Sequence, residues 1–469
     1  MAAYIEDIMQ RSRTAFDIYK KTSLKDRSLF MHAIADALEG RRAELVSAAM
    51  KETHLSEKRL NAELTRTAFQ MRSYGAFCES AEWMDIRIDT ADKERVPPKP
   101  DLRKMMVPLG PVIVFGAANF PFAYSTAGGD TACALAAGCS VVVKAHPGHL
   151  ETGIAVAATI DEAIAKCKLP KDVFIHVTDT SIESGELLVK HPFSKAVGFT
   201  GSFKGGKQLF DWGNQRETPI PVFAEMSSVN PVFILPEKLS GNITETAEML
   251  AASITLDAGQ FCTNPGILIA VDNADLDSFI DALKMQLQKT VAVPMLNEGI
   301  EKNYSLAKEK ALAQKNVGIV FDQSADEHKE AVTIAAVSAK DFIADDMLQQ
   351  EVFGPYSIIV KCKDIREMNE VALHLKGQLT ATIIATKNEV LQNAELIENI
   401  RELCGRIIMN GVPTGVEVCL AMQHGGPYPA STDSRFTSVG ADGIKRFARP
   451  QSFQNWPEEL LPRELKVES

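Results

Sequence analysis

The chain has 469 residues, of which 45% are hydrophobic and 24% are charged, as is ordinary for soluble globular proteins. A chain of this length is expected to form two or three domains, because a single hydrophobic core stops growing at shorter lengths. The formal net charge of −11 argues against a nucleic-acid partner, since binding to phosphates needs a surplus of basic residues.

The sequence also argues against export and membrane insertion. The N-terminal stretch MAAYIEDIMQRSR has acidic residues where a signal peptide has a basic start and an apolar run. No segment approaches the ~18 uninterrupted apolar residues of a membrane helix. None of the eight cysteines falls in a C-x-x-C pair, so we expect a reduced, cytoplasmic protein without structural disulfides or zinc. His146 and His149 have no cysteine or carboxylate cluster beside them, and no metal site is predicted.

Residues 1 to about 83 are predicted to be helical, because apolar residues recur at spacings of three and four, with Gly40 as a break. The period then changes to two in WMDIRIDT (83–90), which is typical of a strand with one face in water. A proline-rich turn and another strand-like segment follow, up to about residue 108. These two strands predict a projecting hairpin that serves as an oligomerisation arm, and we expect a homodimer or homotetramer.

Short apolar strands alternate with helical segments from residue 111 onward. The expected strands read PVIVFGA, SVVVKA, DVFIHV, KAVGFT, PVFAEM and NPVFILP, and the helices between them span 129–138, 151–167, 182–190 and 203–213. Continuous β-branched strands separated by helices indicate a parallel sheet covered on both faces. The sequence therefore predicts a doubly wound, Rossmann-type α/β domain, with its ligand at the carboxyl ends of the strands.

A second alternating block follows. It contains helices at 242–257 and 275–290 and the strands GILIAV, YSIIVKC and ATIIAT, which predict another α/β domain. The expected division is a dinucleotide-binding domain (1–83 and 109–229), a catalytic domain (230–437), and an arm with the C-terminal tail (84–108 and 438–469). The final stretch FQNWPEELLPRELKVES is interrupted by prolines and is expected to form an extended tail.

Glycines join a strand to a helix in GFTGSFKGGKQLF (198–210). Gly201, Gly205 and Gly206 would let backbone amides approach a phosphate at the positive end of the helix. Many α/β turns need such glycines only for their geometry, and the pattern alone does not decide between the two roles. Lys144 ends the strand SVVVK at the same edge of the sheet, where its ammonium could meet a ribose or phosphate or remain solvated.

Three further residues lie at strand ends or turns. Glu225 closes the buried strand PVFAEM, which is a poor place for a merely solvated acid. Asn119 follows the first strand and could cap a helix or donate its amide to an oxyanion. Cys262, in DAGQFCTNPG, could be a small buried apolar residue or a nucleophile held at a turn.

Several motifs together resemble the signature blocks of the aldehyde dehydrogenase superfamily. They are GFTGS, AEMSSVNPVF, GQFCTNPG and EVFGP (351–355), in family order and spread over nearly the whole chain. The segments VFGAANFPFAYSTAGGDTACALAAG and MQHGGPYPASTD are similar to the branch of NAD(P)-dependent 2-oxoglutarate semialdehyde (2,5-dioxovalerate) dehydrogenases and bacterial fatty-aldehyde dehydrogenases. The resemblance implies NAD(P)-dependent oxidation of an aldehyde to a carboxylic acid, with 2-oxoglutarate semialdehyde as the expected substrate.

The resemblance also implies catalytic roles. Cys262 would attack the aldehyde carbon as a thiolate, and the side chain of Asn119 with the backbone amide of Cys262 would hold the oxyanion. Hydride transfer would leave a thioester, which a water activated by Glu225 would hydrolyse. Phe120 would line the substrate channel or serve as a core residue. His424 would lie near the channel entrance, with a structural hydrogen bond as its favoured role.

In the family the glycine-rich turn lies along the pyrophosphate, and other residues hold the riboses. The residues implied to bind the cofactor are Lys144, Gly201, Ser202, Gly206, Glu351 and Phe353. Within this set Lys144 contacts the adenosine ribose, Glu351 holds the nicotinamide ribose and Phe353 packs near the cofactor.

The sequence departs from the family pattern at three places. Phe203 stands where the glycine-rich turn often has a threonine, and Gly128 stands where many members have a lysine. The segment TDTSIESGELL has Glu183 and no arginine to bind the 2′-phosphate of NADP. Lys144 and His146 could still attract that phosphate, so NAD and NADP both remain candidates, with a faint preference for NADP.

Other interpretations stay open. A broad-specificity or medium/long-chain aldehyde dehydrogenase, or a succinate-semialdehyde-type enzyme, would share these motifs. A CoA-acylating dehydrogenase would not need Glu225 to activate water. A non-catalytic structural or binding descendant would have no physical reason to keep Cys262, Glu225 and Asn119 together. A substrate with a remote carboxylate would want an arginine near the channel, for which the sequence offers the loop candidates Arg435 and Arg449.

Overall fold

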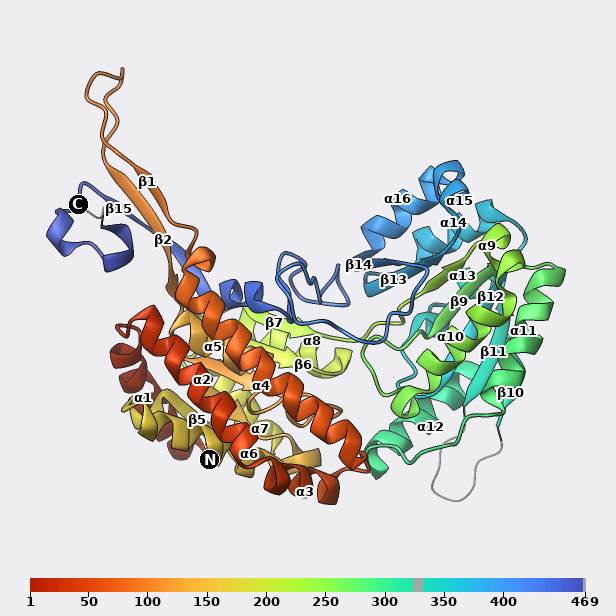
Figure 1. Ribbon diagram of the computed structural model, residues 1–469, viewed down its shortest axis with the longest axis horizontal. Helices are drawn as coiled ribbons and strands as arrows, with labels where there is room; N and C mark the ends of the chain where they lie inside the picture. Colours follow the sequence, from red (N-terminus) through yellow and green to blue (C-terminus); the bar gives the residue numbers. More distant parts are fainter. Residues whose placement is uncertain (324–331, 467–469) are drawn as a thin grey trace.

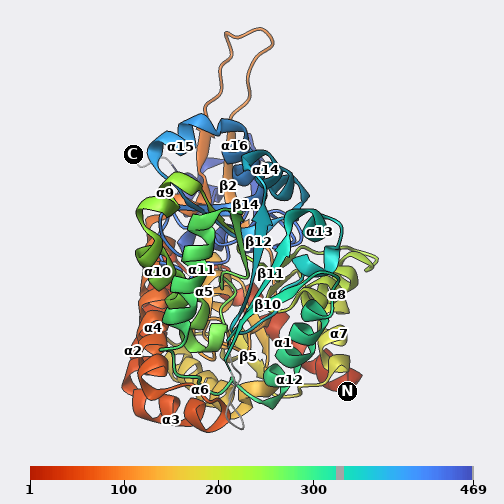
Figure 2. The same cartoon turned by 90° about the vertical axis from the view of Figure 1, so that its right-hand side faces the viewer.

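The computed structural model describes residues 1–323 and 332–466. Two α/β units lie beside each other, the first coloured mainly red to yellow-green and the second green to blue (Figure 1). A hairpin projects away from the first unit, and the view turned by 90° shows its tip standing clear of both (Figure 2). Among the described residues, no helix is long and apolar enough to cross a membrane.

Four helices form the N-terminal part, as the apolar periodicity predicts. They are α1 (Ala2–Tyr19), α2 (Leu24–Gly40), α3 (Arg42–Glu52) and α4 (Glu57–Ser80). Ser23 and Ser56 cap α2 and α4, because their side-chain oxygens accept backbone N–H groups of the first turn. The expected break at Gly40 coincides with the end of α2, which packs along α4.

The first sheet has five parallel strands in the order β5-β4-β3-β6-β7. Its elements are β3 (Val112–Phe115), α5 (Gly129–Ala137), β4 (Val141–Lys144), α6 (Leu150–Lys166), β5 (Phe174–Val177), α7 (Ile182–Lys190), β6 (Ala196–Thr200), α8 (Phe203–Asn214) and β7 (Val222–Glu225). Val112 and Val114 pack with α2, α4, α5 and α6, whereas Ile113 packs with α1, α7 and α8. Both faces of the sheet are covered, and the predicted doubly wound α/β fold is confirmed.

The second sheet has seven strands in the order β10-β11-β12-β9-β8-β13-β14. They are β8 (Val232–Ile234), β9 (Ile267–Val271), β10 (Gly318–Asp322), β11 (Thr333–Ser338), β12 (Tyr356–Cys362), β13 (Gln378–Ile384) and β14 (Cys404–Met409). The helices of this unit are α9 (Pro236–Gly241), α10 (Ile243–Thr255), α11 (Ala274–Leu287), α12 (Glu298–Leu312), α13 (Ala339–Ile343), α14 (Ile365–His374), α15 (Lys387–Gln392) and α16 (Ala394–Leu403). The edge strand β10 runs antiparallel to β11, and the other neighbours in this sheet run parallel.

The strand NPVFILP belongs to the second sheet. The alternation from residue 111 onward groups it with the strands of the first sheet, and this grouping is wrong, whereas the expected catalytic domain from residue 230 onward already includes it. β8 pairs in parallel with β9 and β13. No helix separates β7 from β8, and an apolar strand buried on both faces has the same sequence pattern in either sheet. The chain therefore passes from one sheet to the other directly after Glu225.

The hairpin and the C-terminal region form a small antiparallel sheet. It consists of β1 (Arg87–Asp89), β2 (Leu102–Pro108) and β15 (Ala448–Gln454), in the order β1-β2-β15. β15 pairs with β2 along its whole length. The two alternating segments thus form the expected hairpin, and a third strand from the end of the chain completes it.

The last described residues are not the extended tail that the prolines predict. Two short 3₁₀ helices follow β15, η7 (Glu458–Leu460) and η8 (Arg463–Leu465). Leu461 and Leu465 are buried in the core of the first unit, and Arg103 donates to the backbone oxygen of Leu465 at 2.7 Å. The prolines stop a long helix, but the two leucines still pack the segment against the body.

A long segment after β14 carries the chain back from the second unit to the first. Its return is fixed by an isolated bridge between Glu225 and Ser431, and by the N–H of Met226, which donates to the oxygen of Ala430 at 2.8 Å. The 3₁₀ helix η6 (Ala441–Phe447) then packs against α5. This return brings residues 424–438 to the carboxyl end of β7.

Candidate active site

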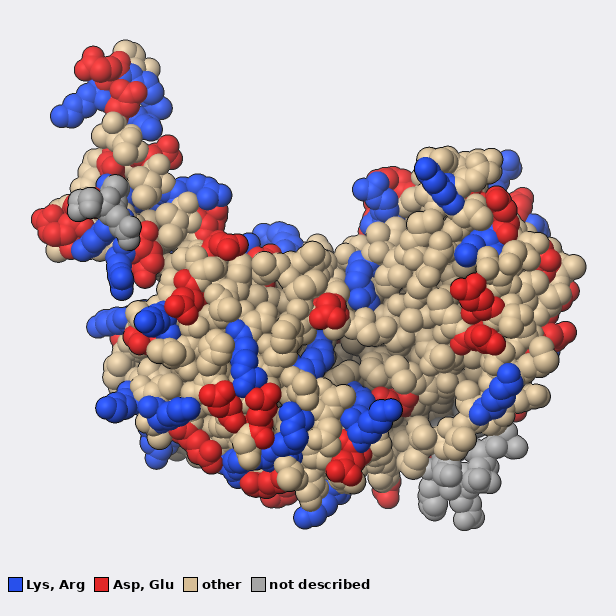
Figure 3. All heavy atoms as spheres, viewed as in Figure 1, with Lys and Arg blue, Asp and Glu red and all other residues tan. Residues whose placement is uncertain are grey.

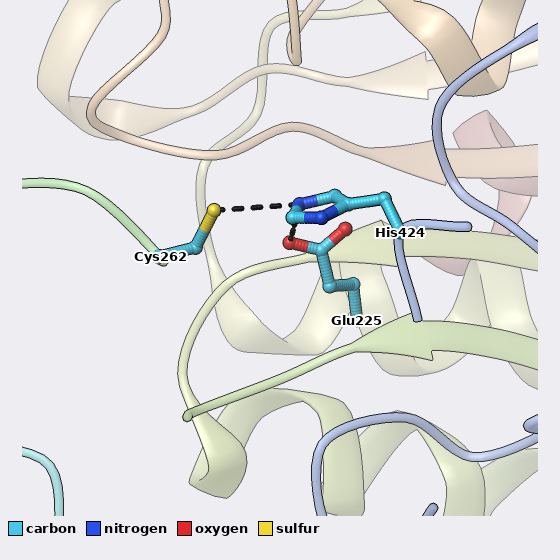
Figure 4. A group of neighbouring side chains, drawn as sticks. All are labelled: Glu225, Cys262 and His424. Atoms are coloured by element: carbon cyan, nitrogen blue, oxygen red, sulfur yellow. Dashed lines mark hydrogen bonds and ion pairs between the residues drawn. The ribbon is translucent and has the colours of Figure 1, made fainter. Parts of the chain in front are cut away.

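Three side chains from distant parts of the chain meet at the end of β7. The Nε2 atom of His424 lies 3.5 Å from the Sγ atom of Cys262 and 3.0 Å from Oε1 of Glu225 (Figure 4). The side chains of His424 and Glu225 are buried, whereas Cys262 is half-buried. The imidazole thus connects the thiol to the carboxylate.

The turn that carries Cys262 is held from several sides. It lies between the 3₁₀ helix η4 (Leu256–Gly259) and β9, and the amide of Asn230 donates to the backbone oxygens of Cys262 and Asn264, each at 2.9 Å. Gly259 has φ of +65°, and a Cβ atom there would lie 2.4 Å from the backbone oxygen of Gly354. Only glycine fits this close approach, which joins the cysteine turn to the loop before β12.

Glu225 and His424 are positioned by the returning segment. The hydroxyl of Ser438 donates to Oε2 of Glu225, and the N–H of Ser438 donates to the backbone oxygen of His424 at 2.8 Å. The N–H of His424 donates to the hydroxyl of Thr437 at 2.9 Å. Within the described residues the buried Nδ1 atom of His424 has no hydrogen-bond partner, so the ring is oriented by its Nε2 contacts.

Burial and the charges of the site set the protonation of the Cys262 thiol. Burial raises the pKa of the Cys262 thiol well above its ordinary value, and the charge of Glu225 raises it further. Burial also acts to raise the pKa of Glu225, but the charge of His424 and the hydrogen bond from Ser438 outweigh it and hold the pKa below its ordinary value. At neutral pH the carboxylate is therefore ionised, and the thiol needs a base to accept its proton.

The same three groups have the composition of a metal site. Their ligand atoms lie within 4.8 Å of one another, and sulfur, imidazole and carboxylate are all ligands of zinc. The sequence predicts no metal there. The contacts of His424 with Cys262 and Glu225 would also suit proton transfer between these groups.

Asn119 lies next to the cysteine turn. Its side-chain Nδ2 atom donates to the backbone oxygen of Gln260 at 2.9 Å. No helix begins at Asn119, since α5 starts at Gly129 after Gly128 as its N-cap, so the helix-capping alternative for Asn119 is wrong. The amide is within reach of the segment that holds the thiol, as an oxyanion donor must be.

A cavity of about 540 Å³ lies beside the cysteine turn. Cys262 lines it, together with Phe120, Tyr124 and Phe261. The ring of Phe120 packs edge-on against Phe261, with centroids 5.7 Å apart, and Arg59 lies over its face. Phe120 therefore lies in the wall of the same cavity as Cys262, whereas His424 is not among the residues that line it.

The glycine-rich turn adopts the strand-to-helix geometry that the sequence predicts. Ser202 is the N-cap of α8, and its hydroxyl accepts the N–H of Gly205 at 3.3 Å. The N–H of Gly201 donates to the backbone oxygen of Glu225 at 3.1 Å, so this turn lies beside Glu225. A Cβ atom on Gly206 would lie 2.5 Å from the side chain of Met226, which gives this glycine a packing role as well.

Lys144 ends β4 at the same edge of the sheet. Its side chain is largely buried, and among the described residues its ammonium makes no hydrogen bond or ion pair. Burial lowers the pKa of Lys144, and the charge of Asp179 partly opposes that effect. An ammonium without a direct partner, at the end of a largely buried side chain, fits the negatively charged or hydroxyl-rich part of a dinucleotide.

Glu351 and Phe353 lie between the 3₁₀ helix η5 (Asp346–Gln349) and β12, near the cysteine turn. Burial raises the pKa of Glu351 to about 7, against hydrogen bonds from Ser227 and Ser228 that lower it. A carboxyl group with this pKa is protonated in part at neutral pH, and it can both donate to and accept from a ribose hydroxyl.

The whole chain is similar to one family of enzymes. Residues 1–452 match the model of the aldehyde dehydrogenase family. The chain belongs to this family. Its members are oxidoreductases that act on aldehydes and use NAD or NADP, and the arrangement of Cys262, Glu225 and Asn119 around the cavity is in keeping with that chemistry.

Two curated members of the family are similar over nearly the full length. An alpha-ketoglutaric semialdehyde dehydrogenase 2 from Azospirillum brasilense is 42% identical over 99% of this chain and 89% of its own. An alpha-ketoglutaric semialdehyde dehydrogenase from Acinetobacter baylyi is 41% identical over 98% of this chain and 88% of its own. Among solved structures, a 1-pyrroline-5-carboxylate dehydrogenase from Thermus with bound NAD has a TM-score of 0.81 at 20% identity, covering 97% of this chain and 86% of its own, and shows a shared fold.

Sequence reasoning missed two residues of the site, Asn230 and Ser438. Asn230 stands in AEMSSVNPVF only five positions after Glu225, but nothing in that motif shows that its amide reaches the cysteine turn. Ser438 lies in a loop without periodicity, so its hydrogen bond to Glu225 had no sequence signal.

Proposed function

We propose that this aldehyde dehydrogenase oxidises 2-oxoglutarate semialdehyde to 2-oxoglutarate, with NAD or NADP as the hydride acceptor. The oxidation of an aldehyde through a cysteine is supported by the contacts from Cys262 through His424 to Glu225, beside a cavity that Cys262 lines. The two relatives named for alpha-ketoglutaric semialdehyde, another name of the same aldehyde, support the substrate.

Formation of the nucleophile comes first. His424 accepts the proton of the Cys262 thiol on Nε2, and the resulting imidazolium is stabilised by Glu225. The thiolate attacks the aldehyde carbon, the carbonyl oxygen becomes an oxyanion, and the backbone N–H of Cys262 with the amide of Asn119 stabilises it. Because burial raises the pKa of the thiol, the imidazole is needed at neutral pH.

Oxidation and hydrolysis follow. The nicotinamide supplies an acceptor for the hydride when the cofactor is bound, with Lys144, Gly201, Ser202, Gly206, Glu351 and Phe353 as the residues that would hold it. Loss of the hydride converts the thiohemiacetal into a thioester on Cys262. Glu225 then accepts a proton from a water that attacks the acyl carbon, and the acid leaves as the thiol is restored. Water is the acyl acceptor in this scheme, and no CoA is required.

We propose that both cofactors are used, with a smaller NADP preference than the sequence suggests. His146 does not supply the second cation, because burial together with the charges of His149 and Lys144 lowers its pKa to about 3. Its Nδ1 atom also accepts the N–H of Gly148 at 3.0 Å. Lys144 is left to attract a 2′-phosphate, while the carboxylates of Asp179 and Glu183 would repel one.

The arm supports assembly into a homodimer or homotetramer. Its sheet leaves β1 and β15 as open edges, and Val96 at the hairpin tip is 93% exposed. A projecting hairpin with open edges is a surface for pairing with a second copy of the chain. On the face drawn in Figure 3, basic and acidic side chains are interspersed, which gives no broad basic surface for nucleic acid there. A cytoplasmic location remains a prediction from the sequence.

A specificity profile tests the proposed function. Purified protein would be assayed at 340 nm with 2-oxoglutarate semialdehyde, succinate semialdehyde and a medium-chain alkanal, each with NAD and with NADP. We expect the highest kcat/KM for 2-oxoglutarate semialdehyde. Equal values for the three aldehydes would contradict the substrate and leave a broad-specificity enzyme, and a requirement for CoA would contradict hydrolysis.

A further inference from the structure

Two arginine side chains line the same cavity as Cys262. Arg66 comes from α4 in the first unit, and Arg406 comes from β14 in the second. They contribute two positive charges to a cavity whose other walls are largely aromatic and aliphatic, such as Phe120, Phe261 and Met422. Neither arginine has a role in the steps proposed above.

Arg66 keeps part of its guanidinium unused. Its Nη2 atom donates to the hydroxyl of Tyr124 and to the backbone oxygen of Val416, both at 3.2 Å, and the group lies over the ring of Tyr124. Its Nη1 atom is buried and has no hydrogen-bond partner among the described residues. A buried N–H of a charged group is costly to leave without an acceptor.

Arg406 shows the same pattern. Its Nη1 and Nη2 atoms donate to the backbone oxygens of Gly415 and Pro413 at 3.0 and 2.7 Å, while its buried Nε atom has no partner in the described part of the chain. Arg406 lines the same cavity as Cys262 and Tyr124, and the charges of these two groups act on its guanidinium.

Among the described residues no carboxylate lies within ion-pair distance of either guanidinium group, although the charge of Glu63, also on α4, acts on Arg66. Neither arginine forms an ion pair, although Glu417 also lines the cavity. Glu417 is exposed, and its carboxylate accepts the N–H of Val418 at 3.0 Å. Both arginines are half-buried, and a guanidinium group partly withdrawn from water favours a carboxylate acceptor, which a ligand can supply.

We propose that Arg66 and Arg406 bind the carboxylate of an aldehyde that carries its acid group at the far end of a short chain. This inference rests on the proposed function and assigns the residues that select its substrate class. Arg435 and Arg449, the candidates from the sequence for binding a remote carboxylate, do not line this cavity. Arg435 pairs with Asp433 on the surface, and Arg449 lies in β15 of the arm.

The chemistry of the substrate matches this arrangement. In 2-oxoglutarate semialdehyde the aldehyde and the carboxylate stand at opposite ends of a five-carbon chain. With the aldehyde carbon at Cys262, the aliphatic part lies along the aromatic wall and the carboxylate lies against the two guanidinium groups that line the cavity. A neutral aldehyde of the same length would leave these N–H groups without acceptors, so the pocket discriminates by polar complementarity.

The test compares Arg66→Met and Arg406→Met with the unchanged protein, and Arg72→Met serves as the matched control. Arg72 lies on α4 with Arg66, but it pairs with Asp36 and Glu39 at the surface. The readout is the ratio of kcat/KM for 2-oxoglutarate semialdehyde to kcat/KM for pentanal, which has five carbons and no carboxylate. We expect the ratio to fall about tenfold or more in each cavity variant, mainly through KM, and to stay constant in the control.

Two results have different meanings. A ratio that stays high in both cavity variants would overturn this inference and leave the proposed function standing. A ratio near one in the unchanged protein would remove the proposed substrate, and with it the reason for a carboxylate site.

A measurement on the unchanged protein covers the case in which a variant does not fold. Alkylation of Cys262 by iodoacetamide would be followed with glutarate or with glutaramide, its neutral analogue of equal length. We expect glutarate to protect the thiol at concentrations at which glutaramide does not. Equal protection by both compounds would overturn the inference.

Discussion

His424 lies with Nε2 3.5 Å from Sγ of Cys262, although 162 positions separate the two residues along the chain. The contact joins the turn before β9 to the segment that returns from the second unit to the first. It changes the interpretation of both residues, because a buried thiol with a raised pKa gains a base within reach. The structural hydrogen bond favoured for His424 from the sequence becomes, in the proposed mechanism, a proton-transfer contact.

Replacement of the imidazole tests this contact. In His424→Gln the first turnover should slow by about 10²- to 10⁴-fold, the usual range for loss of a general base. Alkylation of Cys262 by iodoacetamide should slow at pH 7 and recover at high pH, where the thiol ionises without help. The pH profile separates this role from a structural one, since an unchanged profile together with a slow reaction would contradict proton transfer.

Replacement of the carboxylate should affect a later step. In Glu225→Gln we expect the first turnover to persist as a burst of NAD(P)H, followed by a steady state slower by about 100-fold, because hydrolysis of the thioester lacks its base. Rapid-mixing absorbance at 340 nm resolves the two phases. The account of Glu225 would be wrong if the burst and the steady state slowed to the same extent.

Lys144 provides a test of cofactor binding. We expect Lys144→Ala to raise the KM for NADP by about tenfold and the KM for NAD by less, because the ammonium has a charge partner only in the 2′-phosphate. The control is Lys190→Ala on α7, whose ammonium pairs with Glu186 at the surface. Equal effects on the two cofactors would place Lys144 at the ribose alone, without a role in cofactor choice.

The pKa of Glu351 predicts a pH dependence of stability in the protein without cofactor. The folded-state pKa of about 7 lies above the ordinary value of 4.5, so folding takes up a proton between these two pH values. The contribution of this group to stability is complete below about pH 4.5 and is lost as the pH rises through about 7. In Glu351→Gln this loss disappears. Between pH 5 and pH 8 the free energy of unfolding of the variant should therefore rise by up to about 3 kcal/mol relative to that of the unchanged protein.

Chemical denaturation at the two pH values measures that difference. The measured quantity is the free energy of unfolding of the variant minus that of the unchanged protein. It should be larger at pH 8 than at pH 5, whereas a carboxyl group with an unshifted pKa would give the same difference at both pH values. A variant that lost stability on going to pH 8, relative to the unchanged protein, would contradict the raised pKa.

Much of the fold could be predicted because its signals are local. The strands of the first sheet are continuous runs of β-branched residues, and helices of regular period separate them, so the order of the elements follows from residues near in sequence. Which sheet a strand joins is not local. β8 looks like any strand buried on both faces, and only its pairing with β9 and β13 assigns it. Leu461 and Leu465 likewise anchor a proline-rich end through contacts that no local pattern shows.

The residues of the candidate site also divide into those that a local sequence signal could predict and those that it could not. Glu225 and Cys262 could be proposed because each stands in a motif next to a regular strand or turn. His424 could be named but not placed, because residues 410–440 form loops without periodicity and approach β7 only through the bridge of Ser431 with Glu225. Arg66 and Arg406 line one cavity only when both units are in place. From the sequence, the candidates were the loop residues Arg435 and Arg449 instead.

The central claim is that Cys262 forms the covalent bond to the aldehyde and that water releases the acid. The most direct measurement compares the unchanged protein with Cys262→Ser, using 2-oxoglutarate semialdehyde and NAD or NADP without CoA. NAD(P)H is followed at 340 nm and 2-oxoglutarate is measured at the end. The account predicts equal amounts of the two products from the unchanged protein and neither from the variant. Full oxidation by Cys262→Ser would contradict it.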